Sequence, residues 1–143
     1  MQEELGKEDA HQYNIKQGVG GLVDIEFLAQ YLQLRHGKAH PRVRVPGTVN
    51  ALRALEREGI LSPDESRKLR EYYAFLRKLE SRLRVVANQS KSFLARDPDK
   101  LQTLAKRMGY GGSGAGASLL GDYEEFRQVI RGMFEDKVAR SSA

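Results

Sequence analysis

Cysteine and tryptophan are absent from the 143 residues of this chain, and proline occurs only four times. Without cysteine the chain can form no disulfide, carry no thiolate nucleophile and build no cysteine-ligated metal site. No apolar run approaches the roughly 18 residues that a membrane-spanning helix needs. The first residues, Met1-Gln2-Glu3-Glu4, are acidic and no apolar core of a secretory signal follows them. We therefore expect a cytoplasmic protein with no membrane partner.

The residues that are present have the balance of an ordinary globular domain, with 40% apolar and 30% charged side chains. Lysine and arginine number 24 against 19 acidic residues, which gives a net charge of +5. This excess alone does not distinguish a nucleic-acid binder from a solvated surface. We expect a loose N-terminal segment over 1–15, one domain over 16–138 and a tail at 139–143.

Apolar residues recur at steps of three and four along most of the chain, and no segment alternates with a period of two. This spacing places apolar side chains on one face of an α-helix. The sequence therefore predicts an all-α fold, a helical bundle of about five helices that includes one long basic helix. The expected helices cover residues 22–36, 49–58, 63 to about 89–92, 98–108 and 119–138.

Local signals mark the ends of these helices. Gly37 is expected in the left-handed conformation that commonly ends a helix, and Thr48 is expected to cap the second helix. Ser62-Pro63-Asp64-Glu65 is the clearest signal, because an N-cap serine and a glutamate three residues later form a capping box. The stretch 111–118 predicts a flexible loop, and the two prolines of 40–47 predict an extended connection.

Three of the expected helices have well-defined apolar faces. The first helix has a broad one, typical of a central helix that several neighbours contact; it combines Leu22, Ile25, Leu28 and Leu32 with Phe27, Tyr31 and Leu34. The long helix carries a coiled-coil-like seam of Leu69, Tyr72, Leu76, Leu79, Leu83 and Val86. The last helix presents Leu120, Tyr123, Phe126, Ile130 and Phe134. We expect these faces to form the core.

The basic excess lies in residues 62–96, which hold nine basic and four acidic side chains and therefore a net +5. The pairs Asp64–Lys68 and Glu80–Arg84 have the spacing of favourable ion pairs on an exposed, solvated helix face. The functional alternative is a surface that docks an acidic partner. The candidates for such docking are Arg70, Arg77, Lys78, Arg82 and Arg84.

Lys16 precedes a glycine-rich turn that contains Gly18, Gly20 and Gly21 and leads into the first helix. Such a turn presents free backbone N–H groups at a helix N-terminus, and a nearby lysine adds positive charge, so phosphate could bind there. Many glycine turns, however, only begin a helix. The turn is therefore a candidate anion site of low specificity.

Asp24 and Glu26 lie just inside the first helix, where carboxylates favour the helix dipole. Side chains at i and i+2 of a helix diverge by about 200°, so this pair cannot share a metal ion. His36 and His40 have no carboxylate beside them that would complete a zinc set. The sequence predicts no metal site and no catalytic residue.

One segment is similar to a known family. Lys16-Gln17-Gly18-Val19-Gly20-Gly21-Leu22-Val23-Asp24-Ile25-Glu26-Phe27 resembles the start of the helical domain that follows the nucleotidyltransferase domain in glutamine synthetase adenylyltransferases. That family has a lysine, a glycine turn, Asp/Glu-Ile-Glu-Phe and then Gln-x-x-Gln-Leu. The similarity covers about residues 14–138 and continues through Leu52-Arg53-Ala54-Leu55, Gly59-Ile60-Leu61-Ser62, Tyr73-Ala74-Phe75-Leu76-Arg77-Lys78-Leu79-Glu80 and Leu104-Ala105-Lys106-Arg107-Met108-Gly109-Tyr110.

This resemblance implies a parent enzyme of two similar halves, each a nucleotidyltransferase domain followed by a helical bundle. One half attaches AMP from ATP, with magnesium, to a tyrosine of glutamine synthetase, and the other removes it by phosphorolysis. The implied partners are glutamine synthetase, the PII signal protein and the adjacent nucleotidyltransferase domain. Val23 stands where the other half often has arginine, which favours the C-terminal, adenylylating half.

The chain lacks the upstream Gly-Ser and Asp-x-Asp motifs that carry catalysis in this family. The resemblance therefore implies a non-catalytic or regulatory domain that is inactive alone, with a segment from Lys16 to Glu26 near the nucleotide or against the catalytic domain. Val19 stands where many members have arginine, which weakens a phosphate-binding role. Two alternatives stay open, a helical regulatory module of a PII uridylyltransferase-like protein and a basic helical binding module. Nucleic acid is the more distant partner.

Overall fold

Helices make up most of the structure, a computed structural model that describes residues 12–14, 20–87, 93–95 and 98–139. In these residues the α-helices are α2 (Leu22–His36), α3 (Thr48–Arg57), α4 (Pro63–Ala87), α5 (Pro98–Arg107) and α6 (Ala115–Phe134). A 3₁₀ turn, η1 (Pro41–Val43), follows α2, and a π-helical turn, η2 (Glu135–Ala139), extends α6. The predicted all-α bundle with one long helix is confirmed. The expected end of that helix, at 89–92, lies outside the described residues.

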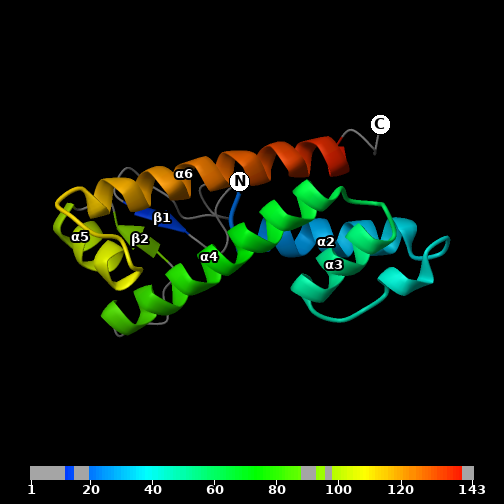
Figure 1. Cartoon of the computed structure of the whole chain (residues 1–143), viewed down its shortest axis with the longest axis horizontal. Coiled ribbons are helices and arrows are strands. Elements are labelled where there is room, and N and C mark those ends of the chain that lie inside the picture. Colours follow the sequence, from blue (N-terminus) through cyan, green and yellow to red (C-terminus); the bar gives the residue numbers. More distant parts are fainter. Residues whose placement is uncertain (1–11, 15–19, 88–92, 96–97, 140–143) are drawn as a thin grey trace.

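The helix α6 runs along one side of the molecule, and α4 runs beside it at an oblique angle (Figure 1). The helix α2 packs against α3, α4 and α6, while α5 packs against the first part of α6 at one end of the molecule. The described part of the chain has no helix that combines the length and the apolar character needed to cross a membrane. This arrangement gives α2 the central position that its apolar face predicts.

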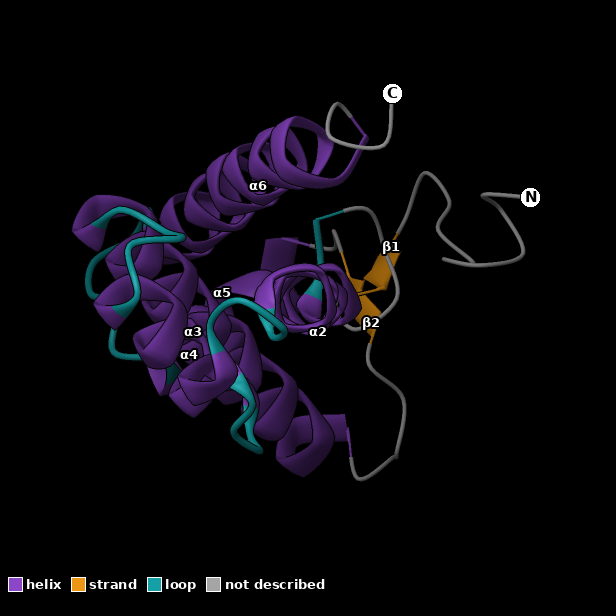
Figure 2. Cartoon of the chain, turned by 90° about the vertical axis from the view of Figure 1, so that its right-hand side faces the viewer, coloured by secondary structure: helices purple, strands orange, loops and turns teal. Residues whose placement is uncertain are grey.

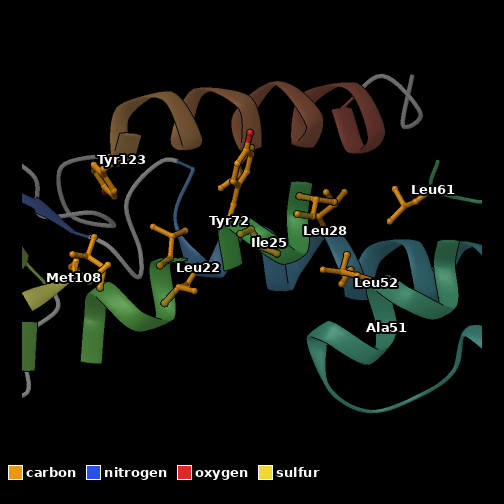
Figure 3. Close-up of a cluster of buried hydrophobic side chains, with 14 of the residues drawn as sticks. Leu22, Ile25, Leu28, Ala51, Leu52, Leu61, Tyr72, Met108 and Tyr123 are labelled. Atoms are coloured by element: carbon orange, nitrogen blue, oxygen red, sulfur yellow. The ribbon is translucent and has the colours of Figure 1, made fainter. Parts of the chain in front are cut away.

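The core lies between α6 on one side and α2 and α4 on the other (Figure 3). The predicted inner faces supply its buried members, which include Leu22, Ile25, Leu28 and Leu32 of α2, Leu69, Tyr72, Leu76 and Leu79 of α4, and Tyr123 and Ile130 of α6. Leu83, Leu120, Phe126 and Phe134 are partly buried against it. The stacked rings of Tyr72 and Phe126, with centroids 4.2 Å apart, join α4 to α6.

One prediction about the core is wrong: Phe27 and Leu34 do not belong to it. Phe27 is 48% exposed and Leu34 is 86% exposed. Phe27 lies at the edge of the core, where one part of its ring contacts Phe134 of α6 and the rest is exposed. Leu34 lies near the end of α2 and is almost fully exposed. The spacing of apolar residues places both side chains on the apolar face of the helix, but it cannot show how far another helix covers that face.

The capping box at the start of α4 is confirmed. The Ser62 N–H donates to Glu65 Oε1 at 2.9 Å, and the Glu65 N–H donates to Ser62 Oγ at 3.1 Å. Thr48, by contrast, is the first residue of α3 and not its cap. The N-cap is Gly47, whose φ of +87° suits glycine. Because glycine has no side chain, α3 has no side-chain hydrogen bond at its N-cap.

The left-handed conformation predicted for Gly37 is also wrong, because its φ is −63°. Space explains the glycine instead. A Cβ atom at this position would lie 2.5 Å from the Gln33 carbonyl oxygen and 2.8 Å from Arg44 Nε. The connection that follows is not fully extended either, since residues Pro41–Val43 form η1.

The loop before the last helix is shorter than predicted, because α6 begins at Ala115 and not at residue 119. The Gln102 side chain holds this region: it donates to the Gly112 carbonyl at 2.9 Å and accepts from the Gly116 N–H at 2.9 Å. Gly116 also approaches α5 closely, since an added Cβ would lie 3.0 Å from the backbone nitrogen of Gln102. Gly116 therefore allows the close packing of α6 on α5.

Two short strands, which the periodicity of the sequence does not predict, pair in an antiparallel manner at the side of the helices (Figure 2). They are β1 (Gln12–Asn14) and β2 (Phe93–Ala95). Strands of three residues are too short to display an alternating pattern. The pair connects a part of the N-terminal segment to the region between α4 and α5.

Candidate functional site

The glycine turn before α2 is packed against α6. Gly20 and Gly21 are buried, and Gly20 has a φ of +75°. A Cβ atom on Gly20 would lie 2.2 Å from the Arg127 carbonyl oxygen. The Gly20 N–H donates to Asp24 Oδ2 at 2.7 Å, so the carboxylate in the first turn of α2 binds the turn itself. Lys16 and Gly18 lie outside the described residues.

Asp24 and Glu26 point to different neighbours, as their spacing predicts. Asp24 Oδ2 lies 3.7 Å from Arg131 Nη1 on α6, and Glu26 Oε2 accepts a hydrogen bond from the Tyr73 hydroxyl on α4 at 3.0 Å. These contacts fix α2 between α4 and α6. Across the described ranges no three histidine, aspartate or glutamate side chains gather where they could hold a metal ion. Asp24 and Glu26 therefore do not converge on one point, as the carboxylates of a magnesium site must.

Ion pairs neutralise the first turns of α4. Asp64 binds both Arg67 and Lys68, the latter at 3.2 Å, which confirms the predicted Asp64–Lys68 pair. Hydrogen bonds from Arg67 and Lys68 hold the pKa of Asp64 below its ordinary value. Arg70, a docking candidate, is half-buried and its Nη2 lies 3.3 Å from Glu56 Oε1 on α3. The N-terminal part of the helix thus has little unpaired charge to offer a partner.

The other docking candidates lie further along α4. Arg77, Lys78 and Arg82 are exposed, and the Arg77 guanidinium lies 5.9 Å from the centre of the Tyr73 ring. The Lys78 ammonium donates to the Met108 carbonyl at 3.5 Å. The side chain of Arg84 is outside the described part. Glu80, expected on the exposed face, is only 8% exposed, because it lies on the buried side beside Leu79 and Leu76.

Sequence reasoning did not foresee the role of Gln33. Its Nε2 donates to the carbonyl oxygens of Val43 and Val45, at 2.7 and 2.8 Å, and so attaches the segment after η1 to α2. An open groove of about 500 Å³ lies here, lined by Gln30, Gln33, Leu34, Arg44 and Val45. No spacing rule identifies a glutamine that binds carbonyls ten and twelve residues away.

Comparison with known protein families identifies the family of this helical module. The family model described as GlnD PII-uridylyltransferase matches residues 1–138. The chain belongs to this family. The match covers all five helices together, including the α2 turn and the basic helix α4.

Individual relatives of this GlnD-family chain are named bifunctional glutamine synthetase adenylyltransferase/adenylyl-removing enzyme. The chain is 41% identical over 95 residues to the protein of Cutibacterium acnes, which is 66% of this chain. It is 38% identical over 108 residues, 74% of the chain, to that of Corynebacterium glutamicum. It is 36% identical over 129 residues, 90% of the chain, to that of Ralstonia nicotianae. These matches confirm the resemblance to adenylyltransferases.

The chain is much shorter than these relatives. It spans 10% of the C. acnes and C. glutamicum proteins and 14% of the R. nicotianae protein. A match of this kind covers one helical module of a protein that contains much more chain. The activity of the whole relative therefore does not pass to this chain without further evidence.

Proposed function

We propose that the chain is the helical, non-catalytic domain of a glutamine synthetase adenylyltransferase, in the C-terminal, adenylylating half. The observation that carries this proposal is the identity of 36–41% over 66–90% of the chain, combined with its span of only 10–14% of the relatives. The parent enzyme would be a cytoplasmic nucleotidyltransferase of nitrogen regulation. It would transfer AMP from ATP to glutamine synthetase, and its other half would remove it.

In this proposal ATP and magnesium bind the neighbouring nucleotidyltransferase domain of the same polypeptide. The contacts of Asp24 with Gly20 and Arg131, and of Glu26 with Tyr73, support this division, because both carboxylates already have partners inside the helical module. Carboxylates that coordinate Mg²⁺ need to converge on one point. The role of this chain is then to present surfaces to the catalytic domain and to partners.

We place the contact with the catalytic domain at the first half of α2. The segment from Lys16 to Glu26 leads into this helix, and Phe27 lies 48% exposed beside it. The Phe27 ring packs against Phe134 with centroids 5.6 Å apart, so its position is held by α6. An exposed aromatic ring on a fixed helix is typical of a residue that anchors an interface.

The contact with glutamine synthetase or the PII signal protein is proposed for the second half of α4. Arg77, Lys78 and Arg82 are exposed there, and Arg84 follows on the same helix. Arg70 contributes less in this proposal, since its guanidinium is paired with Glu56. Charge of one sign on a helix would steer an acidic partner surface.

The proposal predicts that the isolated chain does not adenylylate glutamine synthetase. The test is to incubate the purified chain with glutamine synthetase, Mg²⁺ and radiolabelled ATP, with a full-length relative as the positive control. No label should enter glutamine synthetase from the chain alone. Incorporation by the chain at a rate that survives repeated purification would contradict a non-catalytic domain.

A second candidate function is a regulatory helical module in a PII uridylyltransferase. It is favoured by the description of the matching family model, GlnD PII-uridylyltransferase. The two candidates differ in the protein that the module meets. Immobilised chain that retains PII but not glutamine synthetase would favour the uridylyltransferase, and retention of glutamine synthetase would favour the adenylyltransferase.

A further inference from the structure

The groove between the second half of α2 and the segment after η1 combines apolar and cationic walls. Leu34, the most exposed large apolar side chain among the described residues at 86%, forms one wall with Gln30. Arg44 and Val45 form the other, and the groove has a volume of about 500 Å³. Because it is an open groove and not an enclosed cavity, its shape suits an extended chain better than a small molecule that must be surrounded.

The walls of the groove are held in place by contacts inside the chain. The Gln33 side chain donates to the carbonyls of Val43 and Val45, at 2.7 and 2.8 Å. Val43 is fully buried and anchors this segment in the core. The Arg44 side chain lies across Gly37, where an added Cβ would be 2.8 Å from Nε. A groove with preorganised walls loses little conformational entropy when a ligand binds.

The charge that lines the groove is positive, because Arg44 is the charged residue among its lining residues. Three further basic residues, Arg35, Lys38 and Arg42, are exposed and lie within nine positions of Arg44 in the sequence. The two acidic residues between positions 35 and 58 already have partners, since Glu56 pairs with Arg70 at 3.3 Å and Glu58 binds His40 at 3.2 Å. Partial burial, followed by the charges of Arg35 and His40, holds the pKa of His36 below its ordinary value. The exposed basic side chains of residues 35–44 are therefore not offset by the carboxylates of Glu56 and Glu58, which are already paired.

We propose that this groove binds an extended segment of a partner protein in which an apolar side chain is flanked by carboxylates. Leu34 and Val45 contact the apolar side chain, and Arg44 pairs with an adjacent carboxylate. The side-chain amide of Gln30, exposed at the rim, is available for the backbone of the segment. A nucleic acid would use the basic residues but would gain nothing from an exposed leucine. This site goes beyond the proposed adenylyltransferase function and does not depend on it.

The test uses the purified 143-residue chain and a short, fluorescently labelled peptide of alternating glutamate and leucine. Fluorescence anisotropy should give a dissociation constant of about 10–100 μM. The variants Leu34→Ser and Arg44→Glu should each weaken binding about tenfold or more, because one removes the apolar contact and the other the ion pair. Both side chains are exposed, and thermal melting of each variant checks that the fold is kept.

Two matched controls separate the groove from general properties of the surface. Val23→Ser removes an exposed apolar side chain from the first turn of the same helix, and Val23 is 39% exposed. Lys106→Glu reverses a charge on α5, at the other end of the molecule from the turn that follows α2 (Figure 1). Both controls should bind the peptide within about twofold of the unchanged chain.

Three results would overturn the proposal. The first is the absence of peptide binding up to about 1 mM, which corresponds to roughly 4 kcal/mol of binding free energy. The second is an equal loss of binding in Lys106→Glu and Arg44→Glu, which would show general charge attraction. The third is binding of a DNA duplex more tightly than the peptide, with sensitivity to Arg44→Glu but not to Leu34→Ser. None of these results bears on the adenylylation assay, so the two proposals fail separately.

Discussion

Replacing Gly20 with alanine tests the close packing of the glycine turn on α6. The backbone at Gly20 has a φ of +75°, and a methyl group there would lie 2.2 Å from the Arg127 carbonyl oxygen and 2.6 Å from the Arg127 Cα. Real Cβ atoms do not approach backbone atoms this closely. The turn or α6 must therefore shift, and the Gly20–Asp24 hydrogen bond of 2.7 Å must shift with it.

The expected cost has two parts. Placing an L-residue in the left-handed region costs about 1–2 kcal/mol, and forcing a methyl group into a packed interface costs about 1–3 kcal/mol more. Gly59→Ala is the matched control, because Gly59 has a similar φ of +78° but no atom within 4 Å of an added Cβ. We expect Gly59→Ala to lower the free energy of unfolding only by the first cost. Gly20→Ala should lower it by both costs, about 2–5 kcal/mol in total.

The assay is urea unfolding of both variants, followed by circular dichroism, with the free energies of unfolding compared at equal m-values. Gly20→Ala should be less stable than Gly59→Ala by about 1–3 kcal/mol. Equal free energies of unfolding for the two variants would refute the close approach of the turn to α6. In that case the turn would be open enough to serve as an anion site.

Three further predictions concern stability. Ser62→Ala should lower the free energy of unfolding by about 1 kcal/mol in urea titrations, because the Glu65 N–H loses its cap. Burial, together with the hydrogen bond to Asp122, raises the pKa of Tyr110, so its absorbance should titrate well above pH 10 in the folded chain. The unfolded chain loses that proton first, so the stabilisation is complete below about pH 10 and should decline as pH rises further. Tyr110→Phe should make this decline shallower, and the raised pKa of Tyr72 accounts for part of the remainder. Gln102→Ala should cost about 1–2 kcal/mol, measured by thermal unfolding, since two hydrogen bonds to the start of α6 are lost.

Features that depend on nearby residues could be predicted from the sequence. The capping box of Ser62 and Glu65 needs only a four-residue segment, and both of its hydrogen bonds are present. The divergence of Asp24 and Glu26 follows from helix geometry alone, and the structure shows them bound to α6 and α4 respectively. The buried seam of α4 follows equally from a repeating pattern.

Features that depend on contacts between distant segments could not be predicted. Gly37 was expected to serve the backbone conformation, whereas it makes room for Arg44. Spacing predicts a core position for Leu34, which is 86% exposed, because periodicity reflects apolar character and not the presence of a covering helix. The groove beside Leu34 needs the hydrogen bonds of Gln33 to Val43 and Val45, which bring two segments together. Such tertiary contacts have no counterpart in local spacing.

The pairing of the two short strands is another tertiary contact of this kind. Tyr13 stands opposite Leu94, which is more than eighty positions away along the chain. Neither strand is long enough to show its own periodicity. The partner-docking role of Arg77, Lys78 and Arg82 stays a prediction.

An exchange into a full-length relative tests most directly whether this chain is the helical domain of a glutamine synthetase adenylyltransferase. The matching segment of the C. glutamicum protein, 108 residues long, would be replaced with this chain, and adenylylation of glutamine synthetase would be measured. A second chimera carrying Leu52→Asp should be inactive, because it places a charge at a fully buried position. We predict that the first chimera retains adenylylation and that deletion of the segment abolishes it. A chimera that is folded by circular dichroism but does not adenylylate glutamine synthetase would contradict the proposed function.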